Sequence, residues 1–175
     1  MTFASLLRSA ALMLLCSLLT ACGLTQAVSD GTVSATRAIF YKKIKVMHLD
    51  FEPRSAINAD EAQTPLATMV QVYQLKDRKK VDATDYQKLL RDADNTLKED
   101  IVASKSLLVM PKGSVTLNMP MNEEAKFVAV VGLFNRPDLR NNTWKLVLSR
   151  DDLDPDKPRT IQLNGTGLTL VPVKE

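Results

Sequence analysis

The cysteine at position 22 carries the clearest chemical signal in the chain, because its thiol directly follows Leu19, Thr20 and Ala21. Attachment of a diacylglyceryl group requires a thiol nucleophile, and removal of the preceding segment requires small residues that let a peptidase grip the backbone. The run from Leu19 to Cys22 therefore has the form of a bacterial lipobox. The other cysteine, Cys16, follows two leucines within an apolar segment, and we expect it to be removed with that segment.

The segment before Cys22 has the layout of a secretory signal peptide. Arg8 supplies the positive flank, and residues 10–19 are all apolar or small. This stretch is about half of the ~20 residues that a membrane-spanning helix needs, so it predicts a cleaved signal and no lasting transmembrane anchor. The alternative is an ordinary signal peptide that is cleaved after Ala21 and leaves a free thiol. Such a site prefers a small residue three places before the cut, and Leu19 is large.

Lipidation would hold residues 22–175 at a membrane surface without a spanning segment. Each buried methylene contributes about 0.8 kcal/mol, so one acyl chain binds only marginally, whereas two or three bind durably. In bacteria with two membranes, an aspartate after the lipidated cysteine usually signals retention in the inner membrane, and here the next residue is Gly23. We therefore expect a signal peptide at residues 1–21, a covalent lipid on Cys22, and an outer-membrane location facing the periplasm.

The remaining chemical inventory offers little for catalysis. His48 is the only histidine, which excludes a multi-histidine metal site, and without Cys16 and with Cys22 acylated no disulfide can form. His48 lies in an alternating segment typical of a strand, where it would face solvent or a partner. Carboxylate pairs at 123–124 and 151–152 lie beside turn signals, where solvated charge is the ordinary interpretation. We predict no catalytic residue, no metal site and no cofactor besides the lipid, so an enzyme is not expected.

The composition predicts one globular domain behind a short tether. The chain has 23 basic and 20 acidic residues spread along its length, a formal net charge of +3, which gives no nucleic-acid-binding patch. Residues 22–40 are rich in Ser, Thr, Ala and Gly and predict a lipidated N-terminus followed by a tether with some helical turns. The domain itself is expected at residues 41–175.

Short strands dominate the pattern of this domain. Segments that alternate, or that are continuously apolar and rich in β-branched residues, predict strands at 44–51, 66–75, 107–110, 115–119, 127–134, 144–148, 161–163 and 168–170. The segment 127–134 is apolar on both faces and is expected at the centre of a sheet. About eight short strands predict an all-β fold, a two-sheet β-sandwich.

A helical insertion is expected between the second and third strands. Thr84 and Gln87 match a capping box, and Leu89 recurs at helical spacing after Tyr86, which predicts a helix over 85–92. Further local predictions are a second, weaker helical stretch at 96–103, a solvated loop for the basic run 76–80, and a type I turn at Pro111-Lys112-Gly113.

The connection at residues 52–65 stands out by its length. It is polar, it is bounded by Pro53 and Pro65, and it is longer than a hairpin requires. Loops of this length in a compact domain are often functional, and a sandwich presents such loops on a rigid frame.

Several short motifs follow the lipobox in a specific order and spacing. They are Val72-Tyr73-Gln74-Leu75, Thr84-Asp85-Tyr86 with Leu89, Leu97 with Asp100 and Ile101, the turn at 111–113, Phe127-Val128-Ala129-Val130-Val131 with Phe134, and Trp144-Lys145-Leu146. In this order the mature chain resembles, over nearly its whole length, the TssJ (SciN-type) lipoproteins of the bacterial type VI secretion system.

The resemblance implies a transthyretin-like sandwich that is tethered to the outer membrane and binds the periplasmic C-terminal region of TssM, an inner-membrane subunit that acts together with TssL. It also implies that the loop joining the first two strands takes part in this contact. The location of that loop makes Arg54, Ile57, Asn58, Asp60 and Glu61 the candidate partner-binding residues. The open alternative is another envelope lipoprotein of the same architecture, chaperone-like or ligand-binding, because a fold does not fix a function.

Overall fold

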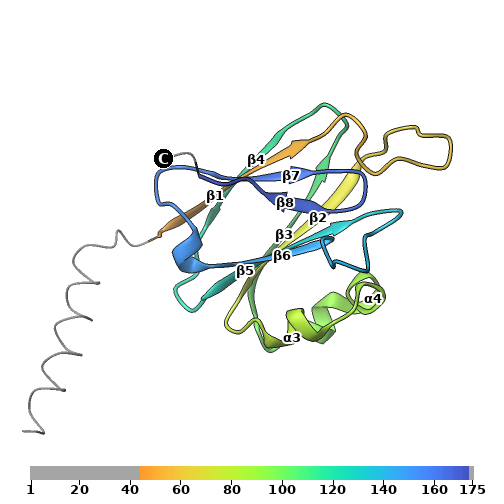
Figure 1. Cartoon of the computed structure of the whole chain (residues 1–175). Coiled ribbons are helices and arrows are strands. Elements are labelled where there is room, and N and C mark those ends of the chain that lie inside the picture. Colours follow the sequence, from red (N-terminus) through yellow and green to blue (C-terminus); the bar gives the residue numbers. More distant parts are fainter. Residues whose placement is uncertain (1–43, 174–175) are drawn as a thin grey trace, which may run out of the picture. The chain divides into compact units, whose positions relative to one another are not determined.

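The computed structural model describes residues 44–173. The predicted signal peptide at 1–21, the lipidation site Cys22 and the tether at 22–40 lie outside these residues. Two sheets of four strands each form the domain, and two helices are inserted between the second and third strands (Figure 1). The predicted all-β sandwich with a helical insertion between strands 2 and 3 is thereby confirmed.

The first sheet has the strand order β4-β1-β7-β8. It consists of β1 (Val46–Pro53), β4 (Val115–Pro120), β7 (Arg159–Leu163) and β8 (Leu168–Leu170). Strand β1 lies in the middle of this sheet, antiparallel to β4 and parallel to β7. The first strand of the described domain is therefore hydrogen-bonded to a neighbouring strand on each side.

The second sheet has the order β3-β2-β5-β6, and all its pairs are antiparallel. It consists of β2 (Thr68–Leu75), β3 (Ile101–Val109), β5 (Phe127–Leu133) and β6 (Lys145–Ser149). A 3₁₀ turn, η1 (Arg150–Asp152), follows β6, and the inserted helices are α3 (Lys79–Ala83) and α4 (Tyr86–Leu97).

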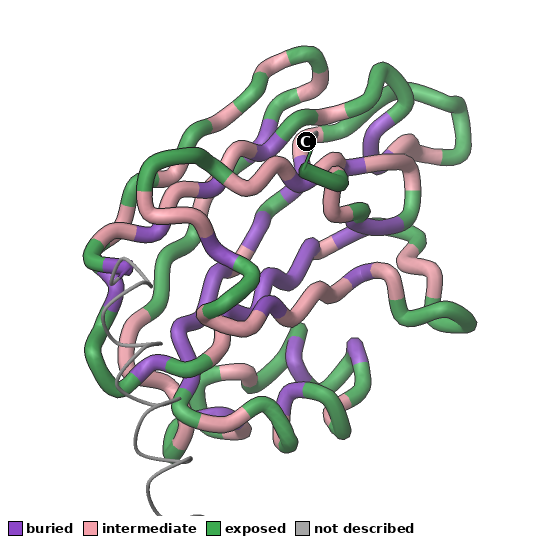
Figure 2. The backbone as a smooth tube through the Cα atoms, turned by 60° about the vertical axis from the view of Figure 1, so that its left-hand side comes forward, coloured by how far each residue is buried: buried purple, intermediate pink, exposed green. Residues whose placement is uncertain are grey.

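Alternating side chains place the core between the two sheets. In β1, Met47, Leu49 and Phe51 are fully buried, while the residues between them are partly exposed. Strand β5 is buried along nearly its whole length, because its second face lies on the side of the sheet that carries α4. Figure 2 shows that the buried segments gather in the interior of the domain. The expectation of a central strand covered on both faces is correct, and burial on this scale is the main source of the domain's stability.

The helical region differs from its prediction in three details. Asp85, and not Thr84, caps α4, because its carboxylate accepts a 2.8 Å hydrogen bond from the backbone N–H of Lys88. Helix α4 continues to Leu97, with a non-helical backbone at Asp92. The helix predicted at 96–103 is wrong, because the chain pairs with β2 from Ile101 onward.

The basic run 76–80 is also more structured than the predicted solvated loop. Lys79 and Lys80 begin α3, and Lys80 forms an ion pair with Glu99. Arg78 pairs with Asp82 one helical turn further on, at 2.6 Å. The Arg78–Asp82 pair spans one turn of α3, and the Lys80–Glu99 pair joins α3 to the segment after α4, although exposed pairs of this kind add little stability.

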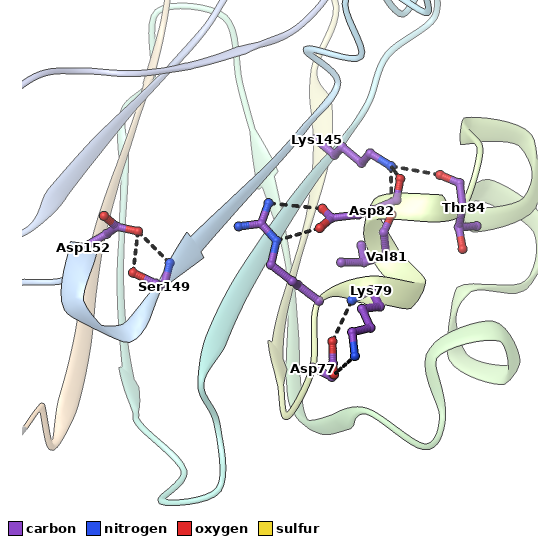
Figure 3. A network of polar contacts seen from close by, with 9 residues as sticks. Asp77, Lys79, Val81, Asp82, Thr84, Lys145, Ser149 and Asp152 are labelled. Atoms are coloured by element: carbon purple, nitrogen blue, oxygen red, sulfur yellow. Dashed lines mark hydrogen bonds and ion pairs between the residues drawn. The ribbon is translucent and has the colours of Figure 1, made fainter.

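Lys145 attaches the end of α3 to the second sheet. Its ammonium group donates hydrogen bonds of 2.8, 2.9 and 3.0 Å to the carbonyl oxygens of Val81, Asp82 and Thr84 (Figure 3). The same group lies 4.8 Å from the centre of the Trp144 ring. Free carbonyl groups at the end of a helix attract a cation, so this contact fixes the insertion against β6.

The turn between β3 and β4 is formed by the predicted residues but has another geometry. The backbone N–H of Gly113 donates a 3.0 Å hydrogen bond to the carbonyl of Met110, which closes a four-residue turn. Lys112 has a φ of 63°, which a type I turn does not allow at its third position and a type II turn requires.

Candidate partner-binding loop

The loop between β1 and β2 begins later than the sequence predicts. Glu52 and Pro53 belong to β1 and lie opposite Gln162 and Leu163 of β7, so the β1–β2 loop comprises residues 54–67. Its first residue is held by a 2.8 Å hydrogen bond from the backbone N–H of Arg54 to the carbonyl of Leu163. The side chain of Arg54 is exposed.

The tip of the β1–β2 loop folds on itself around Asp60. The Asp60 carboxylate accepts a 2.8 Å hydrogen bond from the backbone N–H of Thr64, and the backbone N–H of Asp60 donates to the Thr64 carbonyl at 3.1 Å. Gln63, with a φ of 62°, closes this turn. Asp60 therefore has a structural role in the loop, while its side chain stays partly exposed beside the exposed Glu61.

Two of the five candidate residues lie inside the protein. Ile57 is fully buried and belongs to the hydrophobic core. Asn58 is 5% exposed, and its amide nitrogen donates a 3.1 Å hydrogen bond to the carbonyl of Ala67 across the base of the loop. Both side chains are therefore occupied by intramolecular contacts, and the partner contact of Ile57 and Asn58 stays a prediction.

A second chain segment supports the loop from the side, namely the β5–β6 connection (residues 134–144). The backbone N–H of Asn135 donates a 2.6 Å hydrogen bond to the side-chain oxygen of Asn58. Arg136 donates to the carbonyl oxygens of Ala59 and Asp60 at 3.1 and 2.6 Å. Asn135 and Arg136 were not candidates from sequence, since nothing local marks a contact between segments so far apart in the chain.

The β5–β6 connection is itself well ordered by polar contacts. The carboxylate of Asp138 accepts hydrogen bonds from the backbone N–H groups of Arg140 and Asn141 and from the Asn141 side chain, at 2.8 to 3.1 Å. These bonds, the backbone N–H of Asn141 foremost, lower the pKa of Asp138 because they stabilise the ionised carboxylate.

An aromatic pair attaches the same connection to α4. The Tyr86 hydroxyl donates a 2.7 Å hydrogen bond to the carbonyl of Phe134, and the ring of Tyr86 packs edge-on against Trp144 with centroids 5.1 Å apart. The loop, the β5–β6 connection and the start of α4 are thus linked by direct contacts into one rigid end of the sandwich. Rigid support of this kind lowers the ordering cost of binding a partner.

The histidine considered for chemistry makes a polar contact within the first sheet. His48 Nδ1 lies 2.6 Å from the side-chain oxygen of Asn118, its neighbour across the β1–β4 pair. In the described part of the chain, no three His, Cys, Asp or Glu residues gather as metal ligands would. Nor is any helix among residues 44–173 sufficiently long and apolar to cross a bilayer.

A two-sheet sandwich with a firmly supported loop at one end defines a β-sandwich interaction domain. Its family follows from sequence: residues 45–166 match the profile of the type VI secretion lipoproteins, described as VasD, EvfM and TssJ. The chain belongs to this type VI secretion lipoprotein family. A search of curated proteins gave no significant match.

Solved structures agree with this assignment. A chain in a structure described as the type VI secretion protein TssM C-terminal domain from EAEC is 45% identical, with a TM-score of 0.69, over 74% of this chain and 100% of that one. A chain in a structure described as a type VI membrane complex is also 45% identical over the same shares, with a TM-score of 0.71. The lipoprotein TssJ1 from Pseudomonas aeruginosa shares the fold. It is 20% identical, with a TM-score of 0.63, over 75% of this chain and 100% of that one.

Proposed function

We propose that this protein is an outer-membrane-anchored subunit of the type VI secretion membrane complex that binds the periplasmic C-terminal region of TssM and so bridges the envelope. The proposal rests on two solved structures, each of which contains a chain that is 45% identical to this protein and is covered over its whole length. One structure is described as the TssM C-terminal domain and the other as a type VI membrane complex. TssL belongs to the same complex in this proposal. The role is mechanical attachment, without catalysis.

The lipid on Cys22 provides one end of the bridge in this account. Two or three acyl chains hold a protein durably at a bilayer, and the residues between Cys22 and the domain give the tether its reach. The outer membrane is the proposed location because Gly23, and no aspartate, follows the cysteine.

The β1–β2 loop provides the other end, through the side chains of Arg54, Asp60 and Glu61. Strand β1 connects the beginning of the described domain directly to this loop, and its backbone is hydrogen-bonded to β4 and β7. Near its start, Arg150 donates hydrogen bonds to the carbonyl oxygens of Ile44 and Ala125 at 2.8 and 2.7 Å. A pull between tether and loop is therefore carried by one strand in the middle of a sheet.

Replacing the lipidated residue tests the anchoring half of the proposal. We expect Cys22→Ser to leave a folded protein that fractionates as a soluble periplasmic protein and no longer supports type VI secretion. The matched control is Cys16→Ser, which changes the other cysteine and should leave membrane association and secretion intact. Full secretion by cells carrying only the Cys22→Ser protein would show that the anchor is dispensable.

A further inference from the structure

A groove with a volume of about 300 Å³ lies on the outer face of the second sheet, between the sheet and α4. Side chains of β2, β3 and β5 form its floor, and α4 forms its wall. The lining residues are Gln71, Tyr73, Leu89, Leu90, Arg91, Asp92, Ala93, Asp94, Ser104, Ser106, Val131 and Leu133. The accessible lining of the groove is mostly polar, and Leu89, Leu90, Val131 and Leu133 supply its apolar part.

Tyr73 supplies a polar group at the groove that the fold itself leaves unused. The residue is only 4% exposed and lines the groove, yet its hydroxyl has no hydrogen-bond partner among residues 44–173. Burial, and secondarily the carboxylate of Asp94, raises the pKa of Tyr73, so the hydroxyl stays protonated. Since the Tyr73 hydroxyl opens onto the groove and has no partner among residues 44–173, it is free to form a hydrogen bond with a ligand seated there.

Two carboxylates at the groove have no cationic partner in the described part of the chain. Asp92 and Asp94 are both exposed, and the Asp92 carboxylate accepts only a long 3.4 Å hydrogen bond from Asn95. Arg91 also lines the groove, but its Nε donates to the carbonyl of Gln87 along the helix. With two carboxylates and one guanidinium, the lining is net negative and favours a cation.

The apolar surface continues beyond the groove across three strands. Met69 lies opposite both Leu108 and Leu133 in the register of the sheet. Met69 is 39% exposed, Leu108 is 50% exposed, and Leu90 of α4 is 45% exposed. Exposed apolar residues that adjoin one another in this way commonly mark an interaction surface.

The groove lies at the same end of the sandwich as the β1–β2 loop. Leu133 of the groove comes two residues before Asn135, which bonds to Asn58 of the loop. Figure 1 shows the loop and α4 together on one side of the domain, away from the start of β1. A partner seated on the loop would therefore reach the groove without wrapping around the molecule.

We propose that this groove is a second contact site for the periplasmic region of TssM and that it takes a lysine or arginine side chain of that partner. The aliphatic stem lies against Leu89 and Leu90, the cation pairs with Asp92 and Asp94, and the Tyr73 hydroxyl accepts a hydrogen bond from it. Charge and shape favour this occupant, because such side chains combine an apolar stem with a charged end. The inference rests on the proposed function, since it names the same partner.

Binding measurements on three variants test the groove. The full chain, purified from membranes in detergent, is titrated with the TssM periplasmic C-terminal region at several salt concentrations. We expect Asp92→Asn with Asp94→Asn to weaken binding about tenfold and to flatten its salt dependence, and Tyr73→Phe to weaken it by about threefold. Asp151→Asn, the same chemical change at an exposed site in η1, is the control and should bind like wild type.

The outcomes separate the groove from the proposed function. If wild type binds and Arg54→Glu weakens binding, but the groove variants bind like wild type, the groove inference is wrong and the loop assignment stands. If wild type does not bind TssM, both fail. A change in self-association of the groove variants, with unchanged TssM affinity, would show that a second copy of this chain is the occupant and would overturn the inference.

Discussion

The side-chain oxygen of Asn58 accepts a 2.6 Å hydrogen bond from the backbone N–H of Asn135, so a single amide joins the β1–β2 loop to the β5–β6 connection. The other end of the same amide donates to Ala67 and closes the base of the loop. Asn58 has a φ of 47°, a left-handed conformation that asparagine tolerates better than most residues. The loop is therefore held in shape before any partner arrives.

Replacing Asn58 by alanine removes both hydrogen bonds and places a less tolerant residue at a positive φ. We expect Asn58→Ala to lower the free energy of unfolding by about 2–3 kcal/mol, because the bonds lie in a largely buried site. Urea unfolding measures this. Gln63→Gly is the control, since Gln63 also has a positive φ but is exposed, and its change should stay within about 0.5 kcal/mol. Equal stabilities of Asn58→Ala and wild type would refute the role given to Asn58.

A side chain at position 132 would collide with the core. A Cβ built on Gly132 would lie 2.4 Å from the ring of Phe134, and that ring is almost completely buried. We expect Gly132→Ala to destabilise the domain by about 1–3 kcal/mol, because the ring cannot move without disturbing its neighbours. Urea unfolding measures this change as well. At Gly113 the nearest atom, the Met110 Cβ, is 3.5 Å away, so Gly113→Ala should be nearly neutral in the same assay. A neutral Gly132→Ala would mean that the Phe134 ring is free to shift.

The ionised form of Asp138 should stabilise the β5–β6 connection in a pH-dependent way. Hydrogen bonds from Asn141 and Arg140 lower the pKa of Asp138 below its ordinary value of 3.8. This contribution is present above the pKa of the unfolded chain and is lost as the pH falls through the lower folded pKa. We expect Asp138→Asn to have a lower thermal midpoint than wild type at neutral pH, with the gap closing below about pH 3.8.

The matched control for that comparison is Asp151→Asn, an exposed carboxylate in η1. Its thermal midpoint should follow that of wild type throughout the same pH range. A gap between Asp138→Asn and wild type that stays constant into acid would contradict the assignment, because it would show that the charge of Asp138 is not involved.

The strands were predictable because their signals are local. Alternation of Met47, Leu49 and Phe51 with polar residues places β1, and the unbroken apolar run of β5 places that strand. Strand β3 was predicted only at 107–110, so its first six residues were missed. The second predicted helix was wrong because pairing of Ile101 with Leu75 of β2, a tertiary contact, overrides the helical spacing of Leu97 and Ile101.

The candidate site was predictable only in its position. The length of the loop indicates function, but its interior depends on Asn135 and Arg136, which come far later in the chain, and so the burial of Ile57 and Asn58 could not be predicted. The groove was missed for the same reason. Tyr73 looks like an ordinary strand residue until α4 is seen to lie beside it.

The central claim is that the exposed side chains of the β1–β2 loop bind TssM, and the most direct test is the affinity of a charge-reversed loop. In the full chain, Arg54→Glu combined with Glu61→Lys should weaken binding of the TssM periplasmic C-terminal region by about tenfold or more, with an unchanged thermal midpoint. Lys126→Glu combined with Asp151→Lys reverses two exposed charges elsewhere and should bind like wild type. Wild-type affinity in the loop variant would contradict the account.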